Sequence, residues 1–236
     1  MDGAIFAMGS SKSLRRSVDS GATWTVVNSL YFGLSIRAFD SNTIMMAGAG
    51  GACPSDSGLN VSLDGGYNVA QCYSPPVKMQ SLSAVDQSIL WTKAHWGEPN
   101  GDRVYRSLDG GATWTSSVPG VRAAGKYALA ASSANSAVVV GEGTGDDNIP
   151  TIAETVDGGA SWQQVFKAGQ ASSPLEAVSR LGNGWIAVGP GLVVIRYPGS
   201  ATWTTMAVPG KNLRAVSFYG TAAGWAVGDN GLIVKF

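Results

Sequence analysis

The sequence predicts an all-β fold, a single β-propeller domain spanning residues 1–236, on three observations. A motif of eight residues recurs at nearly constant spacing. Short apolar segments with alternating or β-branched character surround each copy, and no window shows the 3.6-residue period of a helix. Glycine occurs 32 times and tryptophan 8 times, whereas only 14% of residues are charged. This composition is typical of many short strands joined by tight turns.

The recurring motif has the pattern Ser/Thr-x-Asp-x-Gly-x-Thr/Ser-Trp. Its aspartate stands at positions 19, 64, 109 and 157, and Pro198 replaces it in a degenerate fifth copy, so the intervals are 45, 45, 48 and 41 residues. These intervals match the length of one four-stranded propeller blade. The copies read SVDSGATW (17–24), SLDGGYNV (62–69), SLDGGATW (107–114), TVDGGASW (155–162) and RYPGSATW (196–203).

The chemistry of the motif indicates a tight hairpin turn between the third and fourth strands of a blade. Its glycines tolerate the positive φ that such turns need. The carboxylate and the hydroxyl can hydrogen-bond to backbone N–H groups of the turn, and the tryptophan offers a large apolar face to a neighbouring sheet. We therefore predict structural roles, and no catalytic ones, for Asp19, Trp24, Asp64, Asp109, Trp114, Asp157, Trp162 and Trp203.

The strand-like segments give the predicted number of blades. Candidate second and third strands each occur six times, whereas candidate first and fourth strands each occur five times. This pattern predicts six blades of about 40–48 residues, the first without its inner strand and the last without its outer one. Five blades is the alternative. A ring of this kind closes by packing of sheet faces, or a partner adds a strand to an open edge.

The motif resembles the Asp-box (BNR) repeat of sialidase-like β-propellers. The C-terminal segment LRAVSFYGTAAGWAVGDNGLIVKF also resembles the repeat of photosystem II assembly-factor propellers, which combine the same box with a Gly-Trp-x-x-Gly strand. Both resemblances imply that the box is structural and that ligands bind on the opposite face.

Charge and hydropathy exclude several classes of partner. Sixteen basic and sixteen acidic residues give a net charge of zero, which disfavours nucleic acid and anionic membranes as partners. No apolar run approaches the roughly 20 residues that span a bilayer. The N-terminal segment MDGAIFAMGSSKSLRRS places its basic residues after its apolar stretch, the reverse of a secretory signal. A virion or cytoplasmic location is therefore favoured.

The loops between the second and third strands are the candidate ligand site. Three of them, AGGACPSDSG, AHWGEPNGD and GEGTGDDNIP, are long and polar. An aromatic ring beside carboxylates can stack on a sugar and bind its hydroxyls, although solvated loops without a ligand are the alternative. The candidate binding residues are His95, Trp96, Glu98, Asp102, Asp146 and Asp147.

Metal ions and other cofactors have little support in the sequence. Asp146, Asp147 and Asn148 form a weak candidate Ca²⁺ site, because Ca²⁺ takes oxygen ligands. His95 is the only histidine of the chain and has no cysteine close to it in the sequence, so zinc lacks ligands. We expect no cofactor.

The two cysteines, Cys53 and Cys72, lie on either side of the second motif, where Val69 replaces the tryptophan. A disulfide between them would compensate for the missing ring, and two free thiols are the alternative.

The function that the sequence favours is a non-catalytic binding or assembly module. Short loops and zero net charge suit a virion component, such as a phage tail or capsid-surface protein for host attachment, or another assembly component such as an intracellular assembly factor, that docks on protein or glycan. Homo-oligomers are compatible with this role. The alternatives are a carbohydrate-binding lectin and a sialidase-like glycosidase using inner-strand arginines. The Arg-Ile-Pro element of sialidases is absent, which weighs against an enzyme. These arginines are Arg37, Arg122, Arg180 and Arg214.

Overall fold

The computed structural model describes residues 3–9, 13–29, 33–48, 58–94, 102–122, 128–143, 149–169 and 173–236. Their regular structure is β-strand throughout, apart from one 3₁₀ turn at Asp229–Gly231. The chain divides into two compact units, Met1–Ser116 and Ser117–Phe236, which are described separately. The prediction of an all-β fold is therefore confirmed, whereas the single-domain organisation over residues 1–236 stays a prediction.

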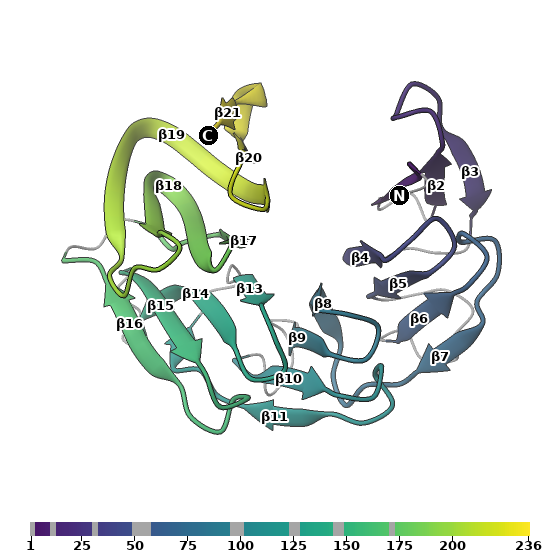
Figure 1. Cartoon of the computed structure of the whole chain (residues 1–236), viewed down its shortest axis with the longest axis horizontal. Helices are drawn as coiled ribbons and strands as arrows, with labels where there is room; N and C mark the ends of the chain where they lie inside the picture. The colour runs from purple at the N-terminus through teal and green to yellow at the C-terminus, as the bar shows by residue number, and fades with distance from the viewer. Residues whose placement is uncertain are drawn as a thin grey trace. The chain divides into compact units, whose positions relative to one another are not determined.

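Unit 1 consists of three antiparallel sheets that follow one another along the chain (Figure 1). Their orders are β1-β2-β3, β4-β5-β6-β7 and β8-β9-β10-β11, so each strand pairs with its neighbour in sequence. The strands are β1 (Ile5–Gly9), β2 (Ser13–Ser17), β3 (Thr25–Asn28), β4 (Ser35–Ala38), β5 (Ile44–Ala47), β6 (Leu59–Ser62), β7 (Gln71–Tyr73), β8 (Met79–Ala84), β9 (Leu90–Ala94), β10 (Val104–Ser107) and β11 (Thr115–Ser117).

Unit 2 consists of two larger sheets. In the first, the order is β12-β14-β15-β16 and β13 also pairs with β14; in the second, the order is β17-β18-β19-β20-β21. The strands are β12 (Val121–Arg122), β13 (Ala128–Ala131), β14 (Ala137–Gly143), β15 (Pro150–Thr155), β16 (Gln163–Lys167), β17 (Ala177–Leu181), β18 (Gly184–Arg196), β19 (Thr204–Tyr219), β20 (Ala223–Gly228) and β21 (Ile233–Lys235).

The core of each unit lies between successive sheets. In unit 1, Leu14 of the first sheet packs with Ile44 and Met46 of the second, and Leu59 of the second packs with Leu90 of the third. Successive side chains of a strand point to opposite faces, so a central strand with a sheet on each side is buried on both of its faces. Strand β5, with the sequence IMMA, is accordingly buried throughout.

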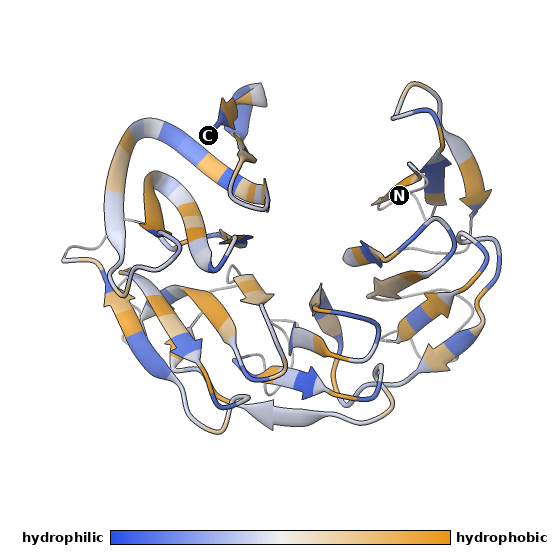
Figure 2. Ribbon diagram, viewed as in Figure 1, coloured by the Kyte–Doolittle hydropathy of each residue, from blue (hydrophilic) through white to orange (hydrophobic). Residues whose placement is uncertain are grey.

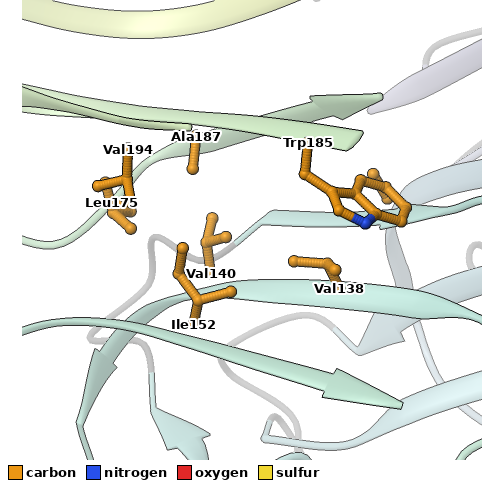
Figure 3. Packing of buried hydrophobic residues seen from close by; sticks show 8 residues of the cluster. Val138, Val140, Ile152, Leu175, Trp185, Ala187 and Val194 are labelled. Carbon is orange, nitrogen blue, oxygen red and sulfur yellow. The ribbon is translucent and has the colours of Figure 1, made fainter. Parts of the chain in front are cut away.

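The same arrangement holds in unit 2. Val138, Val140 and Ile152 of the first sheet face Trp185 and Ala187 of the second (Figure 3). Hydrophobic residues run along β14, all seven of whose residues are buried (Figure 2). Burying apolar area of this extent is the main favourable term in holding the sheets together. Among the described residues, no helix is long and apolar enough to cross a membrane.

The predicted count of six blades is wrong, and the five-blade alternative is supported by the five sheets of the structure. Strand β19 runs without interruption through the last strand of the fifth repeat and the first strand of the next. A common core that includes Ile186, Leu213, Phe218 and Ala226 joins β17–β18 to β20–β21. The short final repeat therefore extends the fifth sheet instead of forming a separate blade.

Candidate functional site

The aspartate motifs occupy the turn between the last two strands of each of the first four sheets, in agreement with the predicted hairpin turn. In the turn between β10 and β11, the Asp109 carboxylate accepts hydrogen bonds from the backbone N–H and the hydroxyl of Thr113, at 2.8 and 2.6 Å. The Ser107 hydroxyl donates to the same carboxylate at 2.7 Å and accepts the N–H of Gly111 at 2.8 Å. Three further turns have this pattern, around Asp19, Asp64 and Asp157.

These hydrogen bonds stabilise the charged form of each carboxylate. The hydroxyl and N–H of Thr113 hold the pKa of Asp109 at about 2, and the equivalent donors do the same for Asp19 and Asp157. In the second turn, the backbone N–H of Asn68 is the main cause of the lowered pKa of Asp64. The carboxylates are therefore engaged within their own turns. That their role is exclusively structural stays a prediction.

The tryptophans of the motifs differ in their contacts and in how far they are buried. The Trp114 Nε1 donates to the carbonyl of Gly111 at 2.9 Å, and its ring packs on the core between the second and third sheets. The Trp162 Nε1 donates to the Ser117 hydroxyl at 3.0 Å. Trp24 is 39% exposed. Contact with a neighbouring sheet is therefore a feature of some copies of the motif and is weaker in the first.

In the degenerate fifth turn, where Pro198 stands in place of the aspartate, the first motif position forms an ion pair with the neighbouring sheet. Arg196 occupies the position of the motif's serine, and its two terminal nitrogens donate to the two oxygens of Glu154 on β15, both at 2.6 Å. The guanidinium also lies 5.1 Å from the centre of the Trp203 ring. The pair links the two sheets of unit 2, and because Arg196 and Glu154 are 42 residues apart, the sequence carries no local signal for it.

Most of the predicted loop site lies outside the described residues. This applies to His95, Trp96, Glu98, Asp146 and Asp147, and also to Asn148 of the candidate Ca²⁺ site, so their roles stay predictions. Asp102 is described and is exposed to solvent. Within the described ranges, no group of three or more His, Cys, Asp or Glu side chains could hold a metal ion.

Cys72 lies on β7 and is disulfide-bonded. Cys53, the other cysteine of the chain, lies outside the described residues. The pairing of the two therefore stays a prediction.

The inner-strand arginines differ in their surroundings. Arg214 on β19 donates to both oxygens of Asp229, at 2.8 Å each, and also pairs with Glu176. Arg37 on β4 lies 5.9 Å from the ring of Phe39. The side chain of Arg122 is outside the described residues. Because Arg214 is already neutralised by two carboxylates, the structure offers no support for its use as a free cation in a glycosidase site.

One face of the final sheet is apolar and exposed. Trp225 and Val227 of β20 and Ile233 of β21 are 47%, 44% and 68% exposed. Their register equivalents earlier in the same sheet, Ile186 and Val188, are both 0% exposed. The sequence prediction did not include this face, and the alternation of large and small residues in GWAVG is the signal that could have identified it.

Comparison with solved structures identifies the architecture. The chain aligns over 100% of its length with a structure described as YCF48 bound to D1 peptide, with a TM-score of 0.58 and 16% identity. It aligns over 99% with YCF48 from Cyanidioschyzon merolae, with a TM-score of 0.57 and 17% identity. It aligns over 95% with a chain of a nidogen/laminin complex, with a TM-score of 0.65 and 9% identity. The fold is a β-propeller.

The propeller spans only part of these similar chains, namely 66% of the YCF48 chain with bound peptide, 70% of the other YCF48 chain and 84% of the chain from the nidogen/laminin complex. No protein-family model matches the sequence. No curated protein matches it either. At these identities the similarity shows the fold alone.

Proposed function

We propose that this propeller is a non-catalytic protein-binding module of a larger assembly. The observation that carries the proposal is the exposed face of Trp225, Val227 and Ile233. Soluble proteins seldom leave contiguous apolar side chains of this size in water, and tryptophan is enriched at the centres of protein interfaces. A partner protein that presents apolar side chains would cover this face in the way that β20 and neighbouring strands cover Ile186 and Val188.

The similar structures support this proposal. One similar propeller is described with a bound D1 peptide, and another is described in a complex of nidogen with laminin. A propeller of this kind can therefore present a surface to another polypeptide. The four aspartate turns also support membership of the Asp-box (BNR) class, since their hydrogen bonds repeat at the same motif positions.

Within this proposal, the assembly is a virion, such as a phage tail or capsid surface, or a cellular complex. The zero net charge supports docking through apolar and polar contacts instead of through attraction to nucleic acid.

The first test asks whether the face is accessible in the purified chain. Hydroxyl-radical footprinting with mass spectrometry should oxidise Trp225, 47% exposed, several times faster than Trp185, 3% exposed. Equal protection of the two tryptophans would contradict the proposal, because the face would then be covered without a partner.

The second test asks whether the face binds protein. Tagged wild type, Trp225→Lys and the control Val156→Lys are used to recover partners from the source organism, and each partner is then purified and rebound. Val156 is 73% exposed on the turn after β15 and does not lie on β20 or β21. A partner protein that binds wild type and Val156→Lys and is lost with Trp225→Lys supports the proposal. Partners indifferent to Trp225→Lys refute it.

Glycan binding and glycoside hydrolysis remain the alternative functions. A glycan array with wild type and Trp96→Ala tests the first, and binding that survives Trp96→Ala would show that the predicted loop site is wrong. A fluorogenic glycoside panel tests the second. Turnover abolished by Arg37→Ala or Arg214→Ala would replace the protein-binding proposal with an enzymatic one.

A further inference from the structure

A polar cavity of about 280 Å³ lies in unit 2, between the two sheets. One wall is the turn that joins β13 to β14, and the other is the turn that joins β17 to β18. Trp185, whose ring packs on Val138 in the core, contributes to the lining (Figure 3). The polar side chains of the lining are Ser132, Ser136, Arg180, Asn183 and Arg196.

Several of these polar side chains have few or no hydrogen-bond partners among the described residues. Among the described residues, the Ser132, Ser136 and Asn183 side chains make no hydrogen bond. Arg180 donates one hydrogen bond, to the carbonyl of Gly182 at 3.3 Å, and has no carboxylate partner within the described ranges. A guanidinium has five N–H donors, so most donors of Arg180 are available to a ligand.

The second arginine fixes the charge balance of the cavity. Arg196 is paired with both oxygens of Glu154, so this pair contributes no net charge. Arg180 then leaves the cavity with a net charge of +1 and a surplus of hydrogen-bond donors. Carboxylate and phosphate groups are the ligands that match a guanidinium flanked by hydroxyl and amide groups.

Two glycines line one wall of this cavity. A side chain at Gly184 would overlap the carbonyl oxygen of Arg196, and Gly182 has a φ of +58° that favours glycine. Gly184 therefore lets the Arg196 end of β18 and the β17–β18 turn approach closely.

We propose that this cavity binds a single oxyanion group, a carboxylate or a phosphate, through Arg180 with help from Ser132, Ser136 and Asn183. The proposal is independent of the protein-binding function, because the cavity and the exposed face of β20 and β21 share no residue.

The experiment titrates the full chain with inorganic phosphate, with glucuronate and with neutral glucose, and follows amide chemical shifts by NMR. We expect saturable shifts at residues 132–136 and 180–185 with at least one of the two anions and none with glucose. Saturable shifts with phosphate alone, with glucuronate alone or with both anions would show which oxyanion groups the cavity binds.

Variants make the test specific. The variant Arg180→Gln should bind the anion about tenfold or more weakly, because it loses the charge-assisted hydrogen bonds of the guanidinium. Arg15→Gln removes the same charge from an exposed position on β2 of unit 1 and should change the affinity by less than about twofold. Because Arg180 is exposed, both variants should fold, and their unchanged amide spectra elsewhere verify this. The proposal fails if neither anion gives saturable shifts, if glucose gives the same shifts, or if Arg180→Gln binds as well as wild type.

Discussion

A single carboxylate organises each of the four aspartate turns, and this makes the stability of the protein depend on pH. The donors around Asp109 hold its pKa at about 2, below the ordinary value of 3.8. A group whose pKa is lower in the folded state stabilises the protein above its unfolded pKa, and this stabilisation is lost as the pH falls through the folded pKa. The relevant window therefore runs from about pH 4 down to about pH 2.

We expect Asp109→Asn to lower the urea midpoint at pH 7 and to flatten the loss of stability between about pH 4 and pH 2. Urea unfolding at several pH values, followed by circular dichroism, measures both effects. Asp102→Asn is the control, because Asp102 is exposed in the same sheet region and makes no hydrogen bond with the described residues. Identical pH profiles for wild type and Asp109→Asn would show that this turn does not depend on the charge.

The Arg196–Glu154 pair gives a second prediction for single residues. The two side chains are 16% and 12% exposed, between the limits of a surface pair and a buried pair. We expect Arg196→Ala to cost about 2 kcal/mol of unfolding free energy, since Glu154 would lose both of its donors.

A double-mutant cycle with Glu154→Gln isolates this contribution. The double variant Arg196→Ala/Glu154→Gln should be less destabilised than the sum of the single variants. Additive effects of the two substitutions would mean that the contact does not hold the sheets together.

The cysteines give a third prediction. We expect denatured, unreduced protein to take up no iodoacetamide and reduced protein to take up two equivalents, as read by mass spectrometry. A bridge between Cys53 and Cys72 closes a loop of roughly 20 residues, which predicts a loss of about 3 kcal/mol on reduction. Two alkylated cysteines without reduction would contradict the predicted pairing.

At the scale of the structural element, the turn between β10 and β11 requires glycine for two separate reasons. Gly111 has a φ of +101°, and an added Cβ would lie 2.5 Å from a methyl group of Leu59. Gly199, in the degenerate fifth turn, has a φ of +80° but no atom near the position of an added Cβ.

We therefore expect Gly199→Ala to cost about 1 kcal/mol from backbone strain alone. Gly111→Ala should cost a further 1–3 kcal/mol, roughly the price of overpacking a core. Urea unfolding of the two variants separates strain from steric overlap. Equal losses would mean that the second sheet yields to the added methyl group.

At the scale of the whole molecule, unit 2 ends in one extended sheet, and this has a consequence for cooperativity. Ile186 is 0% exposed and belongs to a core that also contains Leu213, Phe218 and Phe236. We expect Ile186→Ala to cost about 3 kcal/mol, as buried large-to-small substitutions commonly do.

In the Ile186→Ala variant, amide hydrogen exchange should be faster than in wild type in both β17–β18 and β20–β21, because the two regions share this core. Exchange that accelerates in β17–β18 alone would show that the final repeat is an independent blade, which would restore the count of six.

The sequence by itself determined the strand content and the position of the motifs. Positive-φ glycines and a carboxylate four residues before its hydroxyl partner are local requirements, so Asp109, Gly111 and Thr113 reveal their turn without knowledge of the fold. Only the tertiary structure decided the number of sheets, the Arg196–Glu154 pair and the exposure of Trp225. Those features depend on which sheet lies against which, and contacts between residues tens of positions apart leave no periodic signal in the chain.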